Sequence, residues 1–144
     1  MNELKNQIER PELLKAIRDS IGDARNAVKE LAASFTNNVR SLRLEESENV
    51  FAHLTQNIQD LECFLRFISE LKEGIGFFDK FGLPDDPIAV TNSGLTLFQE
   101  MHTAFESRDW IMLSDLIEYE LSPLLLKEEE WLGALGDRVV AYGM

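Results

Sequence analysis

Apolar residues recur at alternating steps of three and four along most of the first half of the chain. This spacing keeps one face of an α-helix apolar and is typical of helices that pack together in a bundle. The first run comprises Leu14, Ile17, Ile21, Ala24, Val28, Leu31 and Phe35, and the second comprises Phe51, Leu54, Ile58, Leu61, Leu65 and Ile68. The pattern therefore predicts two long helices that pack through these faces.

Proline and acidic residues indicate where these two helices begin. Pro11 suits the first position of a helix, where its missing N–H costs nothing, so the first helix is expected to run from Pro11 to about Arg43. Residues 1–10 would then form a frayed or separate lead-in. The acidic cluster at 45–48 favours a second helix N-terminus, and that helix is expected to end near Gly82.

The strongest break in the pattern lies at residues 82–87, which contain one glycine, two prolines and two aspartates. Such a composition is typical of turns, and it predicts a linker over 82–92 between two helical hairpins. A third helix of about 15 residues is expected after the linker. Its apolar face comprises Leu95, Phe98, Met101, His102 and Phe105.

A fourth helix is expected to start at 107–109, where Ser107 or Asp109 can cap it, and to continue to about Ala141. Pro123 lies inside it and leaves the carbonyl of Tyr119 without a helical donor, so a kink is expected there. Together these elements predict a single all-α domain over residues 1–144. Its architecture would be an antiparallel up-down four-helix bundle made of two helical hairpins, with a short third helix.

Charge is distributed unevenly along the chain, whose net charge is −12. Residues 1–72 carry ten Lys/Arg against twelve Asp/Glu, whereas residues 73–144 carry four against fourteen. A surface this negative repels phosphate backbones and anionic lipid headgroups, so neither nucleic acid nor a membrane is an expected partner. The single cysteine, Cys63, and the polar N-terminal residues predict a cytoplasmic protein without an intramolecular disulfide.

No pattern for a metal, a cofactor or a catalytic site is found. A di-iron carboxylate bundle needs Glu-x-x-His, but Val50 precedes His53 by three residues and Gln99 precedes His102. His53 lies on a helix that could carry a phosphotransfer histidine, but a boundary residue beside the apolar face is the favoured interpretation. Gly-rich phosphate loops and nucleophile elbows are also missing from the sequence. We therefore expect no bound metal and no cofactor.

Glu120 is the polar residue that the predicted fourth helix places inside. At 100° per residue, one face of this helix presents Leu113, Ile117, Leu124 and Trp131. Glu120 falls near the centre of that face, so we expect it to be partly buried and paired with a cation. A catalytic or partner-binding role for Glu120 is the alternative. Asp115, Glu118 and Tyr119 point to the opposite side, toward solvent or a partner.

The same segment carries a resemblance. Residues 109–125, with the sequence DWIMLSDLIEYELSPLL, resemble a segment of small uncharacterised helical-bundle proteins of bacteria. The resemblance implies a bacterial helical bundle without an assigned activity, and it transfers no site residues.

The second predicted helix has more apolar surface than a single packing face requires. Its additional stripe comprises Phe64, Phe67, Leu71 and Phe78. Large exposed apolar patches are rare on monomers, so this stripe is expected to form a homodimer or partner interface. Coverage by the third helix and residues 88–90 is the alternative.

These features together favour a function in protein binding over catalysis. The leading hypothesis is a non-catalytic intracellular interaction or adaptor module, expected to be a homodimer or to bind a helical partner. One alternative is an export or assembly chaperone of the flagellar type, which would hold an amphipathic target in an apolar groove. The other is an enzyme with an unrecognised carboxylate site near Glu120.

Overall fold

The computed structural model of the chain describes residues 2–75, 86–87 and 92–143. Within these ranges the regular elements are all helices. They are α1 (Asn2–Leu44), α2 (Glu48–Ile75), α3 (Asn92–Glu106), α4 (Trp110–Leu116), the π-helical turn η2 (Ile117–Leu121) and α5 (Ser122–Gly143). Because α4, η2 and α5 follow one another without interruption, they form one long helix. The predicted all-α fold of four helices is confirmed.

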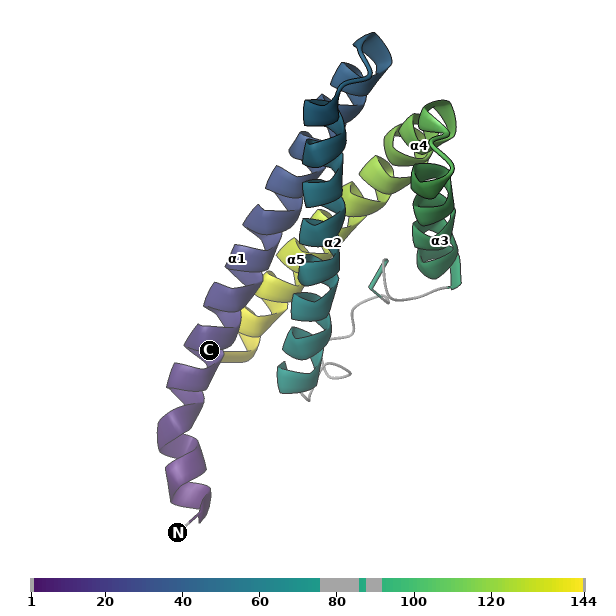
Figure 1. Cartoon of the computed structure of the whole chain (residues 1–144). Coiled ribbons are helices and arrows are strands. Elements are labelled where there is room, and N and C mark those ends of the chain that lie inside the picture. Colours follow the sequence, from purple (N-terminus) through teal and green to yellow (C-terminus); the bar gives the residue numbers. More distant parts are fainter. Residues whose placement is uncertain (1, 76–85, 88–91, 144) are drawn as a thin grey trace.

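Successive helices alternate in direction, as an up-down bundle requires (Figure 1). The backbones of α1 and α5 lie close together along much of their length, and α2 lies against α1. The shorter α3 packs against α4. By contrast, the backbones of α2 and α3 do not approach each other in this way.

The predicted core face of α1 is confirmed. From Ile17 to Phe35 every residue of that face is buried, and the face continues to Val39 and Leu42. Leu14 is half-buried. This stripe packs against the interior of the bundle along the full described length of the helix beyond Pro11.

The core face of α2 differs from the predicted one. Its buried residues are Val50, Leu54, Asn57, Leu61, Phe64 and Ile68. Phe51, Ile58 and Leu65, which the sequence pattern places in the core, are only half-buried. Two registers with three-four spacing coexist on this helix because it is apolar on more than one side. The register that faces α1 contains a polar residue, Asn57. This face therefore does not stand out in the sequence as a continuous run of apolar positions.

The helix ends agree only in part with the predictions. Helix α1 continues through Pro11 to Asn2, so Pro11 is not its first residue. Ser47 caps α2, since its Oγ accepts from the Val50 N–H at 3.2 Å. Asp109 caps α4 by accepting from the Met112 N–H at 3.1 Å. Asp86 and Pro87 are non-helical, whereas the predicted end of the second helix near Gly82 and most of the linker lie outside the described residues.

The long last helix contains a widened turn just before Pro123. The Ser122 N–H donates to the Ile117 carbonyl, five residues earlier, in place of the usual four. Pro123 has no N–H to offer Tyr119, and a wider turn relieves the clash that its ring would cause in a regular helix. Where a kink was expected at Pro123, the structure shows a π-helical turn just before it.

The prediction that Glu120 is partly buried is wrong, because Glu120 is exposed. A π-turn takes up one more residue than an α-turn, which turns later side chains back by roughly 100°, one residue's rotation. The buried apolar positions after Ile117 are Leu121, Leu125, Trp131, Leu132, Leu135 and Val139. The carboxylate that is fully buried along this face is Glu128, with 0% exposure.

Candidate functional site

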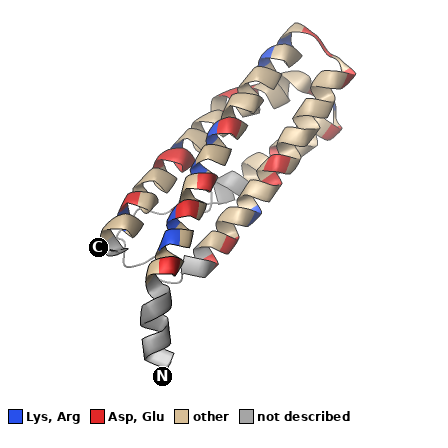
Figure 2. Cartoon of the chain, turned by 90° about the vertical axis from the view of Figure 1, so that its left-hand side faces the viewer, with Lys and Arg blue, Asp and Glu red and all other residues tan. Residues whose placement is uncertain are grey.

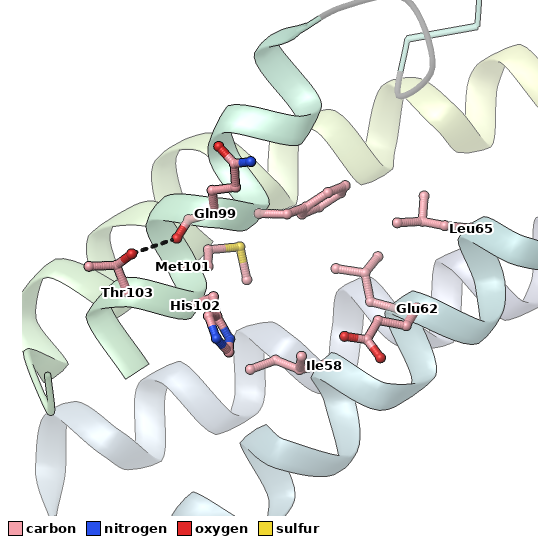
Figure 3. Close-up of a pocket in the computed structure, with 9 residues that line it drawn as sticks. Ile58, Glu62, Leu65, Gln99, Met101, His102 and Thr103 are labelled. Atoms are coloured by element: carbon pink, nitrogen blue, oxygen red, sulfur yellow. Dashed lines mark hydrogen bonds between the residues drawn. The ribbon is translucent and has the colours of Figure 1, made fainter. Parts of the chain in front are cut away.

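An apolar groove of about 370 Å³ runs between α2 and α3 (Figure 3). Helix α2 contributes Ile58, Leu61, Glu62 and Leu65, and α3 contributes Phe98, Gln99, Met101, His102 and Thr103. In Figure 3, Met101 and His102 face the side of α2 that carries Ile58 and Glu62. Its volume is within the range of ligand-binding clefts in proteins.

Burial divides the groove into a floor, walls and a rim. Leu61 and Met101 are buried and form the floor. The walls are formed by residues that are only half-buried, namely Ile58, Leu65 and Phe98. The four polar residues of the groove are exposed and form its rim. An apolar floor and walls with a polar rim is the arrangement that accepts an apolar side chain from a partner.

Two of the rim residues are already engaged within α3. The Thr103 hydroxyl donates to the Gln99 carbonyl at 3.0 Å, as in Figure 3. His102 Nε2 lies 3.0 Å from an Oε of Glu106, one turn further along the helix. Because these polar groups are satisfied locally, the interior of the groove is left to hydrocarbon side chains.

An aromatic cluster explains why the groove opens where it does. The Phe51 ring of α2 stacks on Trp110 of α4, with ring centroids 4.5 Å apart. Phe105 of α3 meets the same indole edge-on at 5.6 Å. These contacts join α2 to the α3–α4 hairpin at one end. Ile58 lies seven residues beyond Phe51, about 10 Å further along α2 at the helical rise, and there the groove begins.

Acidic residues predominate on the helices that form the groove (Figure 2). Helix α2 carries five Asp/Glu and two Lys/Arg, and α3 carries two Glu and no Lys or Arg. Of these, Glu62 lines the groove directly. A partner segment would therefore meet one carboxylate at the rim, that of Glu62, and further acidic residues on the two helices beyond it.

One residue of the predicted interface stripe of α2 is buried and two are half-buried. Phe64 is 5% exposed, so the expectation that it is available to a partner is wrong. It is buried because it belongs to the register that faces α1. Phe67 and Leu71 are half-buried and pack against the core. Phe78 lies outside the described residues.

The prediction that Asp115, Glu118 and Tyr119 point outward is confirmed, since all three are exposed. Arg43 at the end of α1 donates to Asp115 at 2.8 Å and to Glu118 at 2.7 Å. These hydrogen bonds, the one with Asp115 first, raise the pKa of the Arg43 guanidinium above its usual value. Tyr119 is 69% exposed. The two carboxylates thus connect α1 to α4 and to the π-turn.

Sequence reasoning named the α3 wall of the groove but missed the groove itself. Phe98, Met101 and His102 were placed together on one face, and the structure confirms that they share it. Ile58 and Leu65 were assigned to the core because their spacing fits a core face. Core positions and groove positions of α2 have the same apolar spacing. They differ in that α2 is apolar on more than one side, a feature that the sequence pattern assigns to the stripe through Phe64.

The described residues contain no group of three or more His, Cys, Asp or Glu side chains placed to hold a metal ion. Within the same part of the chain, none of the helices has the length and apolar character needed to cross a lipid bilayer.

The fold and the groove define an all-α bundle with an open apolar cleft between two of its helices. A family model described as a domain of unknown function (DUF8042) matches residues 12–130, most of the chain, and the chain therefore belongs to this family. No curated protein and no solved structure matches the chain.

Proposed function

We propose that this protein acts by binding and not by catalysis, and that it accepts an amphipathic helix of a partner protein in the α2–α3 groove. The observation that carries the proposal is the combination of half-buried Ile58, Leu65 and Phe98 around a buried floor. These side chains keep apolar surface in contact with water, which a partner would remove.

A helix is the segment that suits this groove best. The lining residues of α2 are spaced by three and four, so they present ridges to a neighbour. A third helix laid along them could insert its own apolar residues at the same spacing. This mode of recognition uses anchors at positions i, i+3, i+4 and i+7 of the bound segment.

The charge of α2 and α3 indicates which kind of partner helix the groove would bind. Glu62 at the rim and the surplus of acidic residues on α2 and α3 favour a segment whose polar flanks carry Lys or Arg. A second copy of this chain, with its own net charge of −12, would bring like charges together at the groove. An export or assembly chaperone of the flagellar type is a special case of the same activity, since it would hold a target helix in this way.

The proposal can be tested with two amphipathic peptides of about 18 residues, five helical turns. Both carry the same Leu/Ile face, and their polar flanks carry either Lys or Glu. Fluorescence anisotropy should show that the Lys peptide binds at least about tenfold more tightly than the Glu peptide. The variant Leu65→Glu should lose this binding, because it places a charge in the wall of the groove.

Leu126→Glu is the matched control, because Leu126 is an apolar residue of α5 with 56% exposure that does not line the groove. It should bind the Lys peptide like the unmodified protein. The charge reversal Glu62→Lys, at an exposed rim residue, should reduce the preference for the Lys peptide without disturbing the fold. Equal affinity of all variants for both peptides would refute the proposal.

A further inference from the structure

A second groove, different in character, lies between α1 and α2. Its volume is about 560 Å³, and its lining includes four amide side chains, two carboxylates and His53, but no Lys or Arg. An adjoining hollow of about 380 Å³ shares Glu30, Ser34, Asn57 and Asp60 with it. These four shared residues form the centre of the site. They face away from the α2–α3 groove, because Asn57 and Asp60 lie on a different side of α2 from Ile58 and Leu65.

Asn57 is the polar residue at the heart of this groove. It is 3% exposed and occupies a core position of α2. Its Oδ1 accepts from the Ser34 hydroxyl of α1 at 2.9 Å. Its Nδ2 is buried and has no hydrogen-bond partner among the described residues. A buried N–H without an acceptor lowers the stability of the fold, so an acceptor supplied by a ligand would be favourable here.

Two carboxylates stand one turn away on the facing helices. Glu30 precedes Ser34 by four residues in α1, and Asp60 follows Asn57 by three in α2. Because α1 and α2 are antiparallel, both steps lead in the same direction from the Ser34–Asn57 hydrogen bond. Asp60 also accepts from Gln56 Nε2 at 2.9 Å. The carboxylates therefore lie together at one end of the groove, beside the unsatisfied amide.

A purely structural role explains only part of this arrangement. A polar residue at a core position of packed helices can fix their register, and the hydrogen bond to Ser34 does this. That role needs neither the free Nδ2 nor two acidic side chains with no basic residue lining the groove. Asn57 Nδ2 and the two carboxylates would be satisfied by a ligand that carries a hydrogen-bond acceptor and a positive charge a short distance apart.

We propose that this groove binds a lysine or arginine residue of a partner polypeptide. The backbone carbonyl of the bound residue accepts from Asn57 Nδ2, and its cationic side chain lies against Glu30 and Asp60. A peptide residue supplies both groups, whereas a free diamine supplies only the charge. This site is independent of the α2–α3 groove and of the function proposed for it.

Nuclear magnetic resonance titration of the full chain tests the assignment. The side-chain NH₂ signals of Asn57 are identified by their loss in Asn57→Leu. Four probes separate the two requirements: N-acetyl-lysinamide and N-acetyl-argininamide carry carbonyl and charge, N-acetyl-citrullinamide carries the carbonyl alone, and 1,4-diaminobutane carries the charge alone. The first two should shift the Asn57 signals saturably, and the last two should bind at least about tenfold more weakly.

The double variant Glu30→Gln, Asp60→Asn should weaken binding of N-acetyl-lysinamide at least about tenfold. Its control, Glu130→Gln with Asp137→Asn, removes the same charge from exposed positions of α5 that line neither groove and should leave binding unchanged. Circular dichroism establishes that both variants are folded. Diaminobutane binding as tightly as N-acetyl-lysinamide would overturn the carbonyl contact. A dissociation constant weaker than about 10 mM for both cationic residues would overturn the site.

Discussion

The interface between α1 and α5 and the junction between α2 and α3 use the same kinds of apolar side chain but bury them to different extents. In the first, the faces of both helices are buried almost without interruption. In the second, Ile58, Leu65 and Phe98 remain half-buried around a groove. The difference lies in the backbones, which come close together in the first case and not in the second.

This comparison shows that apolar spacing identifies the face of a helix but not what covers it. Leu54 and Leu65 both lie on α2 and both fit a three-four pattern, yet Leu54 is fully buried and Leu65 is not. Residues at the covered interface stabilise the fold. Residues of the α2–α3 groove keep exposed apolar surface, which a partner can bury.

The largest expected effect separates these two leucines. Leu54→Ala should lower the free energy of unfolding by about 2 to 5 kcal/mol, because it leaves a cavity in a covered interface. Leu65→Ala, the same change in the groove, should cost about 1 kcal/mol, since its side chain is already partly hydrated. Urea denaturation of both variants measures the difference. Equal losses would mean that the groove is closed in solution.

A smaller effect of opposite sign is expected at Asn57, the buried polar residue between α1 and α2. Asn57→Leu removes a buried N–H that has no acceptor and places an apolar side chain at a core position. The free energy of unfolding should rise by about 1 kcal/mol. Ile68→Asn, at another buried position of α2, is the contrasting change and should destabilise the fold. A loss of stability in Asn57→Leu would show that the amide is satisfied.

The smallest expected effect concerns the π-turn. Glu120→Ala should change the free energy of unfolding by no more than about 0.5 kcal/mol, because the widened turn directs Glu120 outward. Glu118→Ala should cost more than Glu120→Ala, since Glu118 accepts from Arg43 at 2.7 Å. Thermal unfolding of the two variants side by side gives the order. A larger loss of stability in Glu120→Ala than in Glu118→Ala would indicate that Glu120 is buried in solution.

Much of the fold could be predicted from the sequence because helix periodicity is local. The face of α1 from Ile17 to Phe35 is correct, and so is the cap at Asp109, whereas the kink expected at Pro123 is replaced by a π-helical turn before it. The consequence of Pro123 was not predictable from a constant 100° rotation. One extra residue in a single turn moved Glu120 out of the core.

The candidate sites were harder to predict because they depend on distances between helices. Phe98 and Met101 were recognised as one face, but their separation from α2 is a tertiary property. Asn57 was overlooked because a polar residue interrupts an apolar pattern. Its meaning becomes visible only when Ser34 of α1 is found opposite it. The homodimer expected through Phe67 and Leu71 remains a prediction.

The most direct test of the α2–α3 groove as a binding site is to fill it and measure two properties of the same variant. Leu65→Trp enlarges a half-buried wall residue and should occupy much of the groove's space. We expect an unfolding midpoint equal to or above that of the unmodified protein, with affinity for the Lys-flanked amphipathic peptide reduced at least about tenfold. An unchanged affinity in a folded Leu65→Trp protein would contradict the central claim.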